Sequence, residues 1–188
     1  MTKWLSHRMV ERGIIKEEEQ ELYQFGIRNG MILLLNVVTA LVIGLLTEQL
    51  AVVAVFTLSF MVLRSYTGGY HSDSRIFCYL GSNLVLLVPV YTQAVFYKTS
   101  LAWLLAVLLV SAGIIFLLSP MHSKNRKLDK EEQKHFGRKA RLIAALELAV
   151  LGILWHAGQI PYAYAVYTGI CITALFMLVG KAQLWIQS

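Results

Sequence analysis

The feature that most constrains this chain is a series of long apolar segments separated by short polar stretches. There are six of them, at residues 31–46, 50–63, 79–97, 101–118, 142–155 and 160–179. A helix needs about 20 apolar residues to cross a bilayer, and the third, fourth and sixth segments approach that length. The second and fifth segments have only about 14 residues. They therefore extend through their polar flanks, form short helices packed against the rest of the protein, or are re-entrant. We predict an all-α polytopic membrane protein with about six transmembrane helices.

Composition agrees with a membrane location. Hydrophobic residues make up 57% of the 188-residue chain and charged residues only 15%, whereas soluble domains are about 45–50% apolar. The net charge of +6 suggests a topology signal and attraction to membrane lipids first. We see no basic stripe interleaved with aromatics, and therefore expect no nucleic-acid partner. The length suits one domain, so residues 1–188 are treated as a single integral membrane domain.

The positive charges are distributed asymmetrically. If all six segments cross, every Lys and Arg except Lys98 lies on the same side. The positive-inside rule makes that side cytoplasmic, together with both termini and the two long loops. The outer turns, residues 47–49, 98–100 and 156–159, are very short. Nearly all polar chemistry is therefore expected on the cytoplasmic face.

The N-terminal stretch, residues 1–28, is predicted to form one or two interfacial amphipathic helices. Trp4, Leu5 and Met9 can share an apolar side, with basic residues such as Arg8 around it. The stretch has no long apolar core after its positive charges, which argues against a signal peptide. It either anchors and orients the protein or offers a docking surface to an amphipathic partner helix.

A histidine and a cysteine lie at the edge of an apolar segment, in the stretch RSYTGGYHSDSRIFC at residues 64–78. A thiol with a pKa near 8.5 is only about 3% thiolate at neutral pH, and an adjacent imidazole can take its proton. In one continuous helix His71 and Cys78 would be about 10.5 Å apart along the axis, which is too far for a hydrogen bond. Because Gly68 and Gly69 permit a break, we predict a cytoplasmic loop that carries His71. It folds back over a helix that begins near Asp73 and carries Cys78.

Plainer interpretations exist for the same residues. A histidine beside a membrane often contacts headgroups, and a lone cysteine in an apolar helix usually packs, as we expect for Cys171. Because Cys171 lies inside an apolar segment, no disulfide framework is expected. Two ligands seven residues apart with no third do not make a zinc site. We expect no metal and no organic cofactor.

The motif resembles the signature of the AgrB (accessory gene regulator B) family. Its matching residues are Arg64, Gly68, Gly69, Tyr70, His71 and Cys78. The chain length, the N-terminal helix before the membrane part, and a second loop with a proline followed by basic residues extend the resemblance over nearly the whole chain.

The resemblance implies a membrane cysteine endopeptidase of bacterial quorum sensing, located in the plasma membrane with its active site on the cytoplasmic side. It makes Cys78 the nucleophile, His71 the general base, and an AgrD-like propeptide with an acidic tail the substrate. Cleavage would release the tail and leave the peptide on Cys78 as a thioester. An internal cysteine or serine of the peptide would then close a thiolactone or lactone. The resemblance also suggests a homodimer.

Four further residues of the motif have alternative roles. Backbone N–H groups around Gly68 and Gly69, or the Arg64 guanidinium, are candidate donors to an oxyanion. Arg64 is equally well interpreted as a topological anchor. Asp73 orients His71 or caps the following helix, and we favour the cap.

The basic cytoplasmic loop, residues 119–141, is a topology signal first and a hypothetical binding site for the acidic tail second. The residues assigned to the tail are Lys124, Arg126, Lys127, Arg138 and Lys139. Glu147 is the one carboxylate inside an apolar run, where acids are costly and often functional. It contacts the substrate or a subunit, reaches the polar edge, or pairs with Lys or Arg.

A transporter or channel component of six spans is the alternative function. We find no pair of matching Gly/Pro-broken helices of the kind that marks transporter sites, and the polar residues gather on one face. A protease of the same kind that acts on something other than a signal peptide also stays open.

Overall fold

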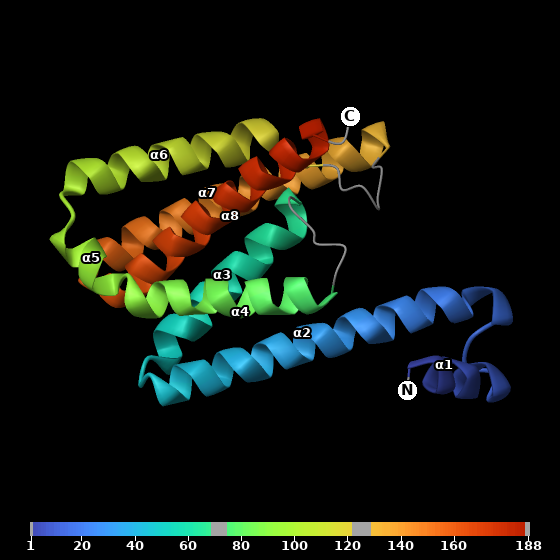
Figure 1. Ribbon diagram of the computed structural model, residues 1–188. Helices are drawn as coiled ribbons and strands as arrows, with labels where there is room; N and C mark the ends of the chain where they lie inside the picture. The colour runs from blue at the N-terminus through green and yellow to red at the C-terminus, as the bar shows by residue number, and fades with distance from the viewer. Residues whose placement is uncertain (1, 69–74, 122–128, 187–188) are drawn as a thin grey trace. The chain divides into compact units, whose positions relative to one another are not determined.

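The computed structural model describes residues 2–68, 75–121 and 129–186, leaving aside the side chains at positions 2, 29, 75–78, 130, 184 and 186. Within these ranges every regular element is a helix, which confirms the all-α prediction for this part of the chain. The elements are α1 (Thr2–Glu11), the 3-10 helix η1 (Glu17–Glu19), α2 (Gln20–Leu46), α3 (Leu50–Thr67), α4 (Arg75–Tyr91), α5 (Gln93–Lys98), α6 (Leu101–Leu118), α7 (Lys130–His156) and α8 (Ile160–Ile186) (Figure 1).

Four segments of the described chain are long and apolar enough to cross a membrane. They are Glu17–Leu46, Leu50–Thr67, Leu101–Leu118 and Ile160–Gln183. A fifth apolar helix, Tyr79–Tyr91, is shorter. Several spanning helices are thus supported by length and composition. The six crossings, the interfacial N-terminal helices and the cytoplasmic termini stay predictions.

The chain divides into two compact units, residues Met1–Thr39 and Ala40–Ser188. In the first unit, α1 has an exposed apolar and basic surface. The Trp4 side chain is 60% exposed, and the Arg8 guanidinium carbon lies 5.0 Å from the centre of its ring. Ser6 is buried, and its hydroxyl donates to the Lys3 carbonyl at 3.0 Å. This arrangement is compatible with a surface helix of the kind predicted.

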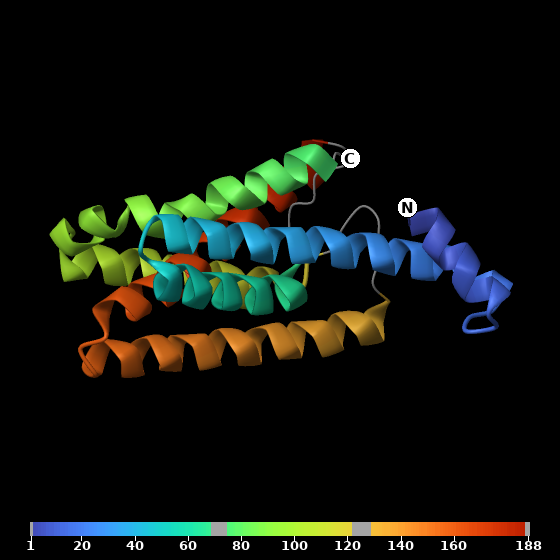
Figure 2. The same cartoon turned by 90° about the horizontal axis from the view of Figure 1, so that it is seen from below.

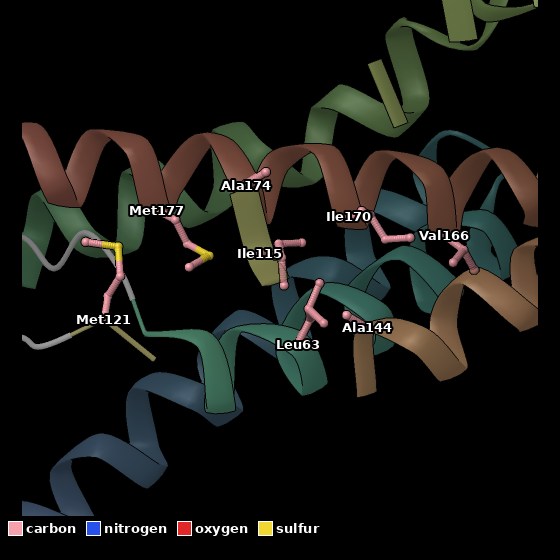
Figure 3. Close-up of a cluster of buried hydrophobic side chains, with 8 residues drawn as sticks. All are labelled: Leu63, Ile115, Met121, Ala144, Val166, Ile170, Ala174 and Met177. Atoms are coloured by element: carbon pink, nitrogen blue, oxygen red, sulfur yellow. The ribbon is translucent and has the colours of Figure 1, made fainter. Parts of the chain in front are cut away.

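The second unit is built around α8, which contacts α3, α4, α5, α6 and α7 and is the most buried of the four candidate spans. One core cluster joins α8 to α3, α6 and α7 (Figure 3) and consists of Leu63, Ile115, Met121, Ala144, Val166, Ile170, Ala174 and Met177. A second cluster joins α8 to α3, α4 and the end of α2 and consists of Ala40, Val52, Val53, Phe56, Leu86, Ala165 and Ile172.

The helices α3 and α8 approach closely where a glycine faces a serine. A Cβ atom added to Gly169 would lie 2.5 Å from the Ser59 hydroxyl oxygen and 3.2 Å from the Ser59 Cβ. Small residues allow helix backbones to come together in membranes, where packing and hydrogen bonds replace the hydrophobic effect as the driving force. Gly169 therefore fixes how near α3 lies to the central helix.

Two elements differ from the predicted segments. The third apolar segment, predicted as one run over residues 79–97, is divided into α4 and α5 at Thr92. The Thr92 hydroxyl donates to the Val88 carbonyl at 2.8 Å and also forms a hydrogen bond with the Tyr164 hydroxyl. Pro89 lies in the last turn of α4, where its missing N–H weakens the helix. The break thus depends partly on a residue far away in the sequence.

The second difference is α7, which begins at Lys130 and so includes the last part of the predicted basic loop. A capping box starts this helix: the Asp129 carboxylate accepts from the Glu132 N–H at 2.7 Å, and the Glu132 carboxylate accepts from the Asp129 N–H at 3.3 Å. The short fifth apolar segment is therefore the second half of a 27-residue helix.

Within the second unit, the ends of the helices fall into two groups. Figures 1 and 2 show the ends of α3, α6 and α8 at the same end of the unit as the beginnings of α4 and α7. The opposite end holds α5 and the turns before α3, α6 and α8. We call the first of these the motif end, because the described residues on either side of the motif's centre, at the end of α3 and the beginning of α4, lie there.

Candidate functional site

The predicted site residues are described unequally. His71, Gly69, Asp73, Lys124, Arg126 and Lys127 lie outside the described residues, as does the side chain of Cys78. The backbone of Cys78 is one turn into α4, whose described part begins at Arg75. Arg64, Gly68, Arg138, Lys139 and Glu147 are described, and they define the surroundings of the motif.

The last turn of α3 is closed by Gly68 and Arg64. Gly68 adopts a φ of 71°, which few residues other than glycine tolerate, and its N–H donates to the Arg64 carbonyl at 3.4 Å. The Arg64 guanidinium turns back to donate to the Gly68 carbonyl, and its central carbon lies 5.3 Å from the centre of the Phe176 ring on α8. Arg64 therefore connects Gly68, where the motif leaves α3, to Phe176 on the central helix α8.

Three residues that follow α6 lie between α3 and α7: Ser119, Pro120 and Met121, which we call the 119–121 segment. The Met121 N–H donates to the Thr67 carbonyl at 2.9 Å. A Cβ atom on Gly68 would lie 2.5 Å from the Met121 carbonyl oxygen, and one on Gly137 would lie 2.9 Å from the Pro120 Cδ. The two long connections of the motif end are thus in direct backbone contact.

Our sequence analysis placed the 119–121 segment and Gly137 in the basic loop, residues 119–141, but gave neither a structural role. The packing of the segment gives no local signal, because it consists of contacts with residues far away in the chain. Gly137 does carry a signal: an isolated glycine inside a helical pattern often has a packing reason. The Ser119 hydroxyl is buried and has no hydrogen-bond partner among the described residues.

The beginning of α7 brings basic and aromatic side chains to the end of α3. The Lys139 ammonium lies 5.9 Å from the centre of the Tyr66 ring, which in turn lies 6.3 Å from the Phe136 ring. Arg138 is exposed. One turn further, Arg141 donates to the Phe116 carbonyl at 3.1 Å. Lys139 therefore lies beside the end of α3, and the binding role predicted for Lys139 and Arg138 stays a prediction.

Glu147 is in a different place from the rest of the predicted site. The Ser59 hydroxyl donates to its Oε2 atom at 2.9 Å, which joins α7 to α3. Ser59 precedes Thr67 by eight residues, or about 12 Å along the helix axis. The structure thus gives Glu147 a hydroxyl partner within the bundle and does not bring it to Gly68.

The remaining chemistry of the described residues is sparse. Cys171 is a free cysteine in α8, partly buried, in agreement with the packing role predicted for it. No group of three or more His, Cys, Asp or Glu side chains in the described ranges is placed to hold a metal ion. The expectation of no metal concerns the whole chain and stays a prediction.

These features first define a class: a helical protein with several long apolar helices, as in a membrane protein, in which the described ends of the motif residues 64–78 lie at one end of the second unit. Comparison with known proteins then gives the family. The model of the family described as accessory gene regulator B (AgrB) matches residues 1–178. The chain belongs to the AgrB family, as the motif at residues 64–78 predicted.

Three relatives place the chain within this family. An AgrB-like protein of Clostridium perfringens (strain SM101 / Type A) is 23% identical over 148 residues, covering 76% of this chain and 69% of that protein. A second AgrB-like protein, from C. perfringens (strain 13 / Type A), is 24% identical over 131 residues, covering 66% and 61%. Accessory gene regulator protein B of Staphylococcus intermedius is 26% identical over 156 residues, covering 81% and 80%. No solved structure matches the chain.

Membership of the AgrB family implies a part in processing the accessory gene regulator autoinducer. It also implies an AgrD-type propeptide as a partner.

Proposed function

We propose that this chain is a membrane cysteine endopeptidase that removes the C-terminal tail of an AgrD-type propeptide and promotes cyclisation of the remainder. The observation that carries the proposal is the position of Cys78 one turn into α4, with the stretch that bears His71 connecting it to Gly68 at the end of α3. The positive end of a helix dipole favours a thiolate. The basic residues of α7 lie at the same end of the unit.

The proposed reaction has two acyl transfers. His71 takes the proton of the Cys78 thiol, and the thiolate attacks the carbonyl carbon of the scissile peptide bond. The C–N bond breaks as the imidazolium gives its proton to the leaving amine, and the tail departs. The peptide stays on Cys78 as a thioester. A thiol or hydroxyl of the peptide then attacks this thioester, loses its proton to His71, and leaves a ring and a free Cys78.

Arg64 and Gly68 act in this scheme by positioning the loop. The hydrogen bond from the Arg64 guanidinium to the Gly68 carbonyl supports this role more directly than that of an oxyanion donor. The oxyanion donors are then backbone N–H groups around Gly69 or at the beginning of α4, as predicted. Asp73 is assigned to capping that helix.

The acidic tail of the propeptide is the proposed partner of the basic residues at the motif end. Lys139 and Arg138 lie near the end of α3, and Lys124, Arg126 and Lys127 precede α7 in the chain. Opposite charges raise association rates and fix register more than they add affinity. We therefore assign these residues to guiding the tail, and Glu147 to joining α3 and α7 through Ser59.

We place the protein in the bacterial plasma membrane, in contact with lipid, with the motif end in the cytoplasm. This placement rests on the positive-inside rule, which puts Lys98 alone on the outer side. The homodimer suggested by the family resemblance is part of the same proposal.

Tail release tests the proposal directly. The purified protein in liposomes is incubated with the AgrD-type propeptide encoded by a neighbouring short reading frame, and mass spectrometry follows the free tail. We expect release by the unmodified chain and by Cys171→Ala, and none by Cys78→Ala or His71→Ala. Release by Cys78→Ala would overturn the assignment of the nucleophile. Binding without any release would favour a transport role instead.

A further inference from the structure

We infer that Gly137, on α7, is a positioning residue for the candidate site, because it lets the 119–121 segment fit against the end of α3. This inference rests on the proposed function, because it concerns the geometry of the same His71 and Cys78 site. The main measurement is the reactivity of the Cys78 thiol, which needs no substrate.

On the α7 side, the 119–121 segment packs against Gly137, which is buried. A Cβ atom on it would lie 2.9 Å from the Pro120 Cδ and 3.3 Å from the Ser119 carbonyl oxygen. Both atoms belong to the backbone or to a ring fused to it, so neither can rotate away as the end of a long side chain would. An alanine at position 137 must therefore push the 119–121 segment away from α7.

The second step is the contact on the α3 side. The segment meets α3 through the hydrogen bond from the Met121 N–H to the Thr67 carbonyl, and through the Met121 carbonyl oxygen that fills the space of a Gly68 side chain. Thr67 is fully buried, and the Met121 side chain belongs to the same buried core cluster as Met177 (Figure 3). Because α3 is held by these contacts, a shift of the segment is transmitted to Gly68.

Gly68 is the point from which the motif residues leave α3. Gly68 is the last described residue before the stretch that carries His71, and its carbonyl also accepts the Arg64 hydrogen bond. Its backbone angles set the direction in which the chain leaves α3. Gly137 thus controls, through two backbone contacts, how the histidine-bearing stretch begins.

Two other helical glycines lack a contact of this kind and serve for comparison. Gly152, on the same helix, and Gly113, on α6, would each meet nothing within 4 Å if they carried a Cβ atom. A glycine inside a helix is less favourable than an alanine. At position 137 the close approach of Pro120 gives a reason for the glycine, and at position 152 the described contacts give none.

Alkylation of Cys78 by iodoacetamide tests the inference. All chains carry Cys171→Ala, so that Cys78 is the only thiol, and the rate is followed over a pH series in detergent. A thiol paired with an imidazole stays reactive below the ordinary pKa of about 8.5. We expect Gly137→Ala to lower the rate at neutral pH by about tenfold and to move the profile towards that of an ordinary thiol. Gly152→Ala is expected to match the parent chain, and thermal unfolding checks that all variants are folded.

A second pair of variants keeps the inference testable if Gly137→Ala does not fold. Met121→Ala loosens the 119–121 segment and should also lower the alkylation rate. Val166→Ala trims a residue of the same core cluster that lies away from Met121 (Figure 3), so it leaves the segment in place and should keep the rate of the parent chain. An unchanged profile in folded Gly137→Ala, or in Met121→Ala if only that variant folds, overturns the inference.

Tail release separates this inference from the proposed function. If the parent chain releases the tail but Gly137→Ala does not change the reactivity of Cys78, the inference is wrong and the proposed function stands. A parent chain that releases no tail, with Cys78 alkylation that falls in Gly137→Ala, contradicts the proposed function alone. A parent Cys78 with the pH profile of an ordinary thiol overturns the inference, because there is then no paired geometry to position.

Discussion

At the scale of single residues, the second unit depends on positions where a side chain would not fit. Gly169 is one, since its missing Cβ makes room for Ser59. Gly68 is another, because its φ of 71° and the Met121 carbonyl both exclude a side chain. Close packing of this kind resists added volume, because neighbouring groups have to leave their preferred rotamers or positions.

Gly169→Ala is therefore predicted to destabilise the protein. The added methyl group would overlap the Ser59 hydroxyl, and overpacking of this kind costs about 1–3 kcal/mol. Gly113→Ala is the matched control, because it makes the same change in α6, where nothing lies within 4 Å. It should be neutral or stabilising by up to about 1 kcal/mol. Thermal unfolding in detergent compares the two, and equal stabilities would contradict the packing described for α3 and α8.

Glu147 offers a second test at this scale. Glu147→Gln keeps an oxygen that can accept the Ser59 hydrogen bond, whereas Glu147→Ala removes it and leaves a buried hydroxyl without its partner. We expect the glutamine variant to retain tail release and most of its stability. The alanine variant should lose about 1–3 kcal/mol of unfolding free energy. A loss of tail release in a stable glutamine variant would show that the charge of Glu147 contacts the substrate after all.

At the scale of elements, α7 shows how a local signal fixes a helix start. The side chains of Asp129 and Glu132 satisfy two N–H groups at its beginning. This capping box joins the basic residues and the shorter apolar run into one continuous helix, which places Lys139 beside Tyr66. The start of α7 therefore matters for the basic face at the motif end.

Replacement of Asp129 tests this role. Asp129→Ala should cost about 0.5–2 kcal/mol, whereas Asp129→Asn should cost little because asparagine caps as well as aspartate. Hydrogen exchange at the amides of Glu131 to Gln133 would report fraying of the first turn in the alanine variant only. Equal protection in both variants would mean that the side-chain oxygen at position 129 does not hold the helix start.

The helices could be predicted from the sequence in part, because some of their features depend on local residues and others on residues far away in the chain. Apolar length and period are local properties, so the helical class and the position of Cys78 near the start of α4 could be anticipated. The capping box of α7 has a local signal, since an aspartate precedes a glutamate by three residues, but the many charges of this stretch favour the loop predicted for residues 119–141. The break at Thr92 depends on Tyr164, and the fit of Pro120 depends on Gly137. Contacts between residues so far apart leave no local pattern.

At the scale of the whole molecule, the six-span topology predicts which turns lie on each side of the membrane. If six segments cross, the turn at residues 156–159 and the basic residues of α7 lie on opposite sides of the membrane. Single cysteines at Gln159 and at Gln133, in a chain without Cys78 and Cys171, can be labelled in intact cells with a membrane-impermeant maleimide. We expect labelling of the first only, and of both after permeabilisation. Labelling of both in intact cells would contradict the six-span arrangement.

The proposed mechanism requires Cys78 to carry the peptide as a thioester. The most direct measurement is the intact mass of the protein after acid quench. The propeptide used has its internal cysteine or serine changed to alanine, so that the ring cannot close. We predict an added mass equal to the propeptide without its tail, located on Cys78 by fragmentation and absent from Cys78→Ala. Tail release with no adduct at any quench time, or an adduct on another residue, would contradict the claim.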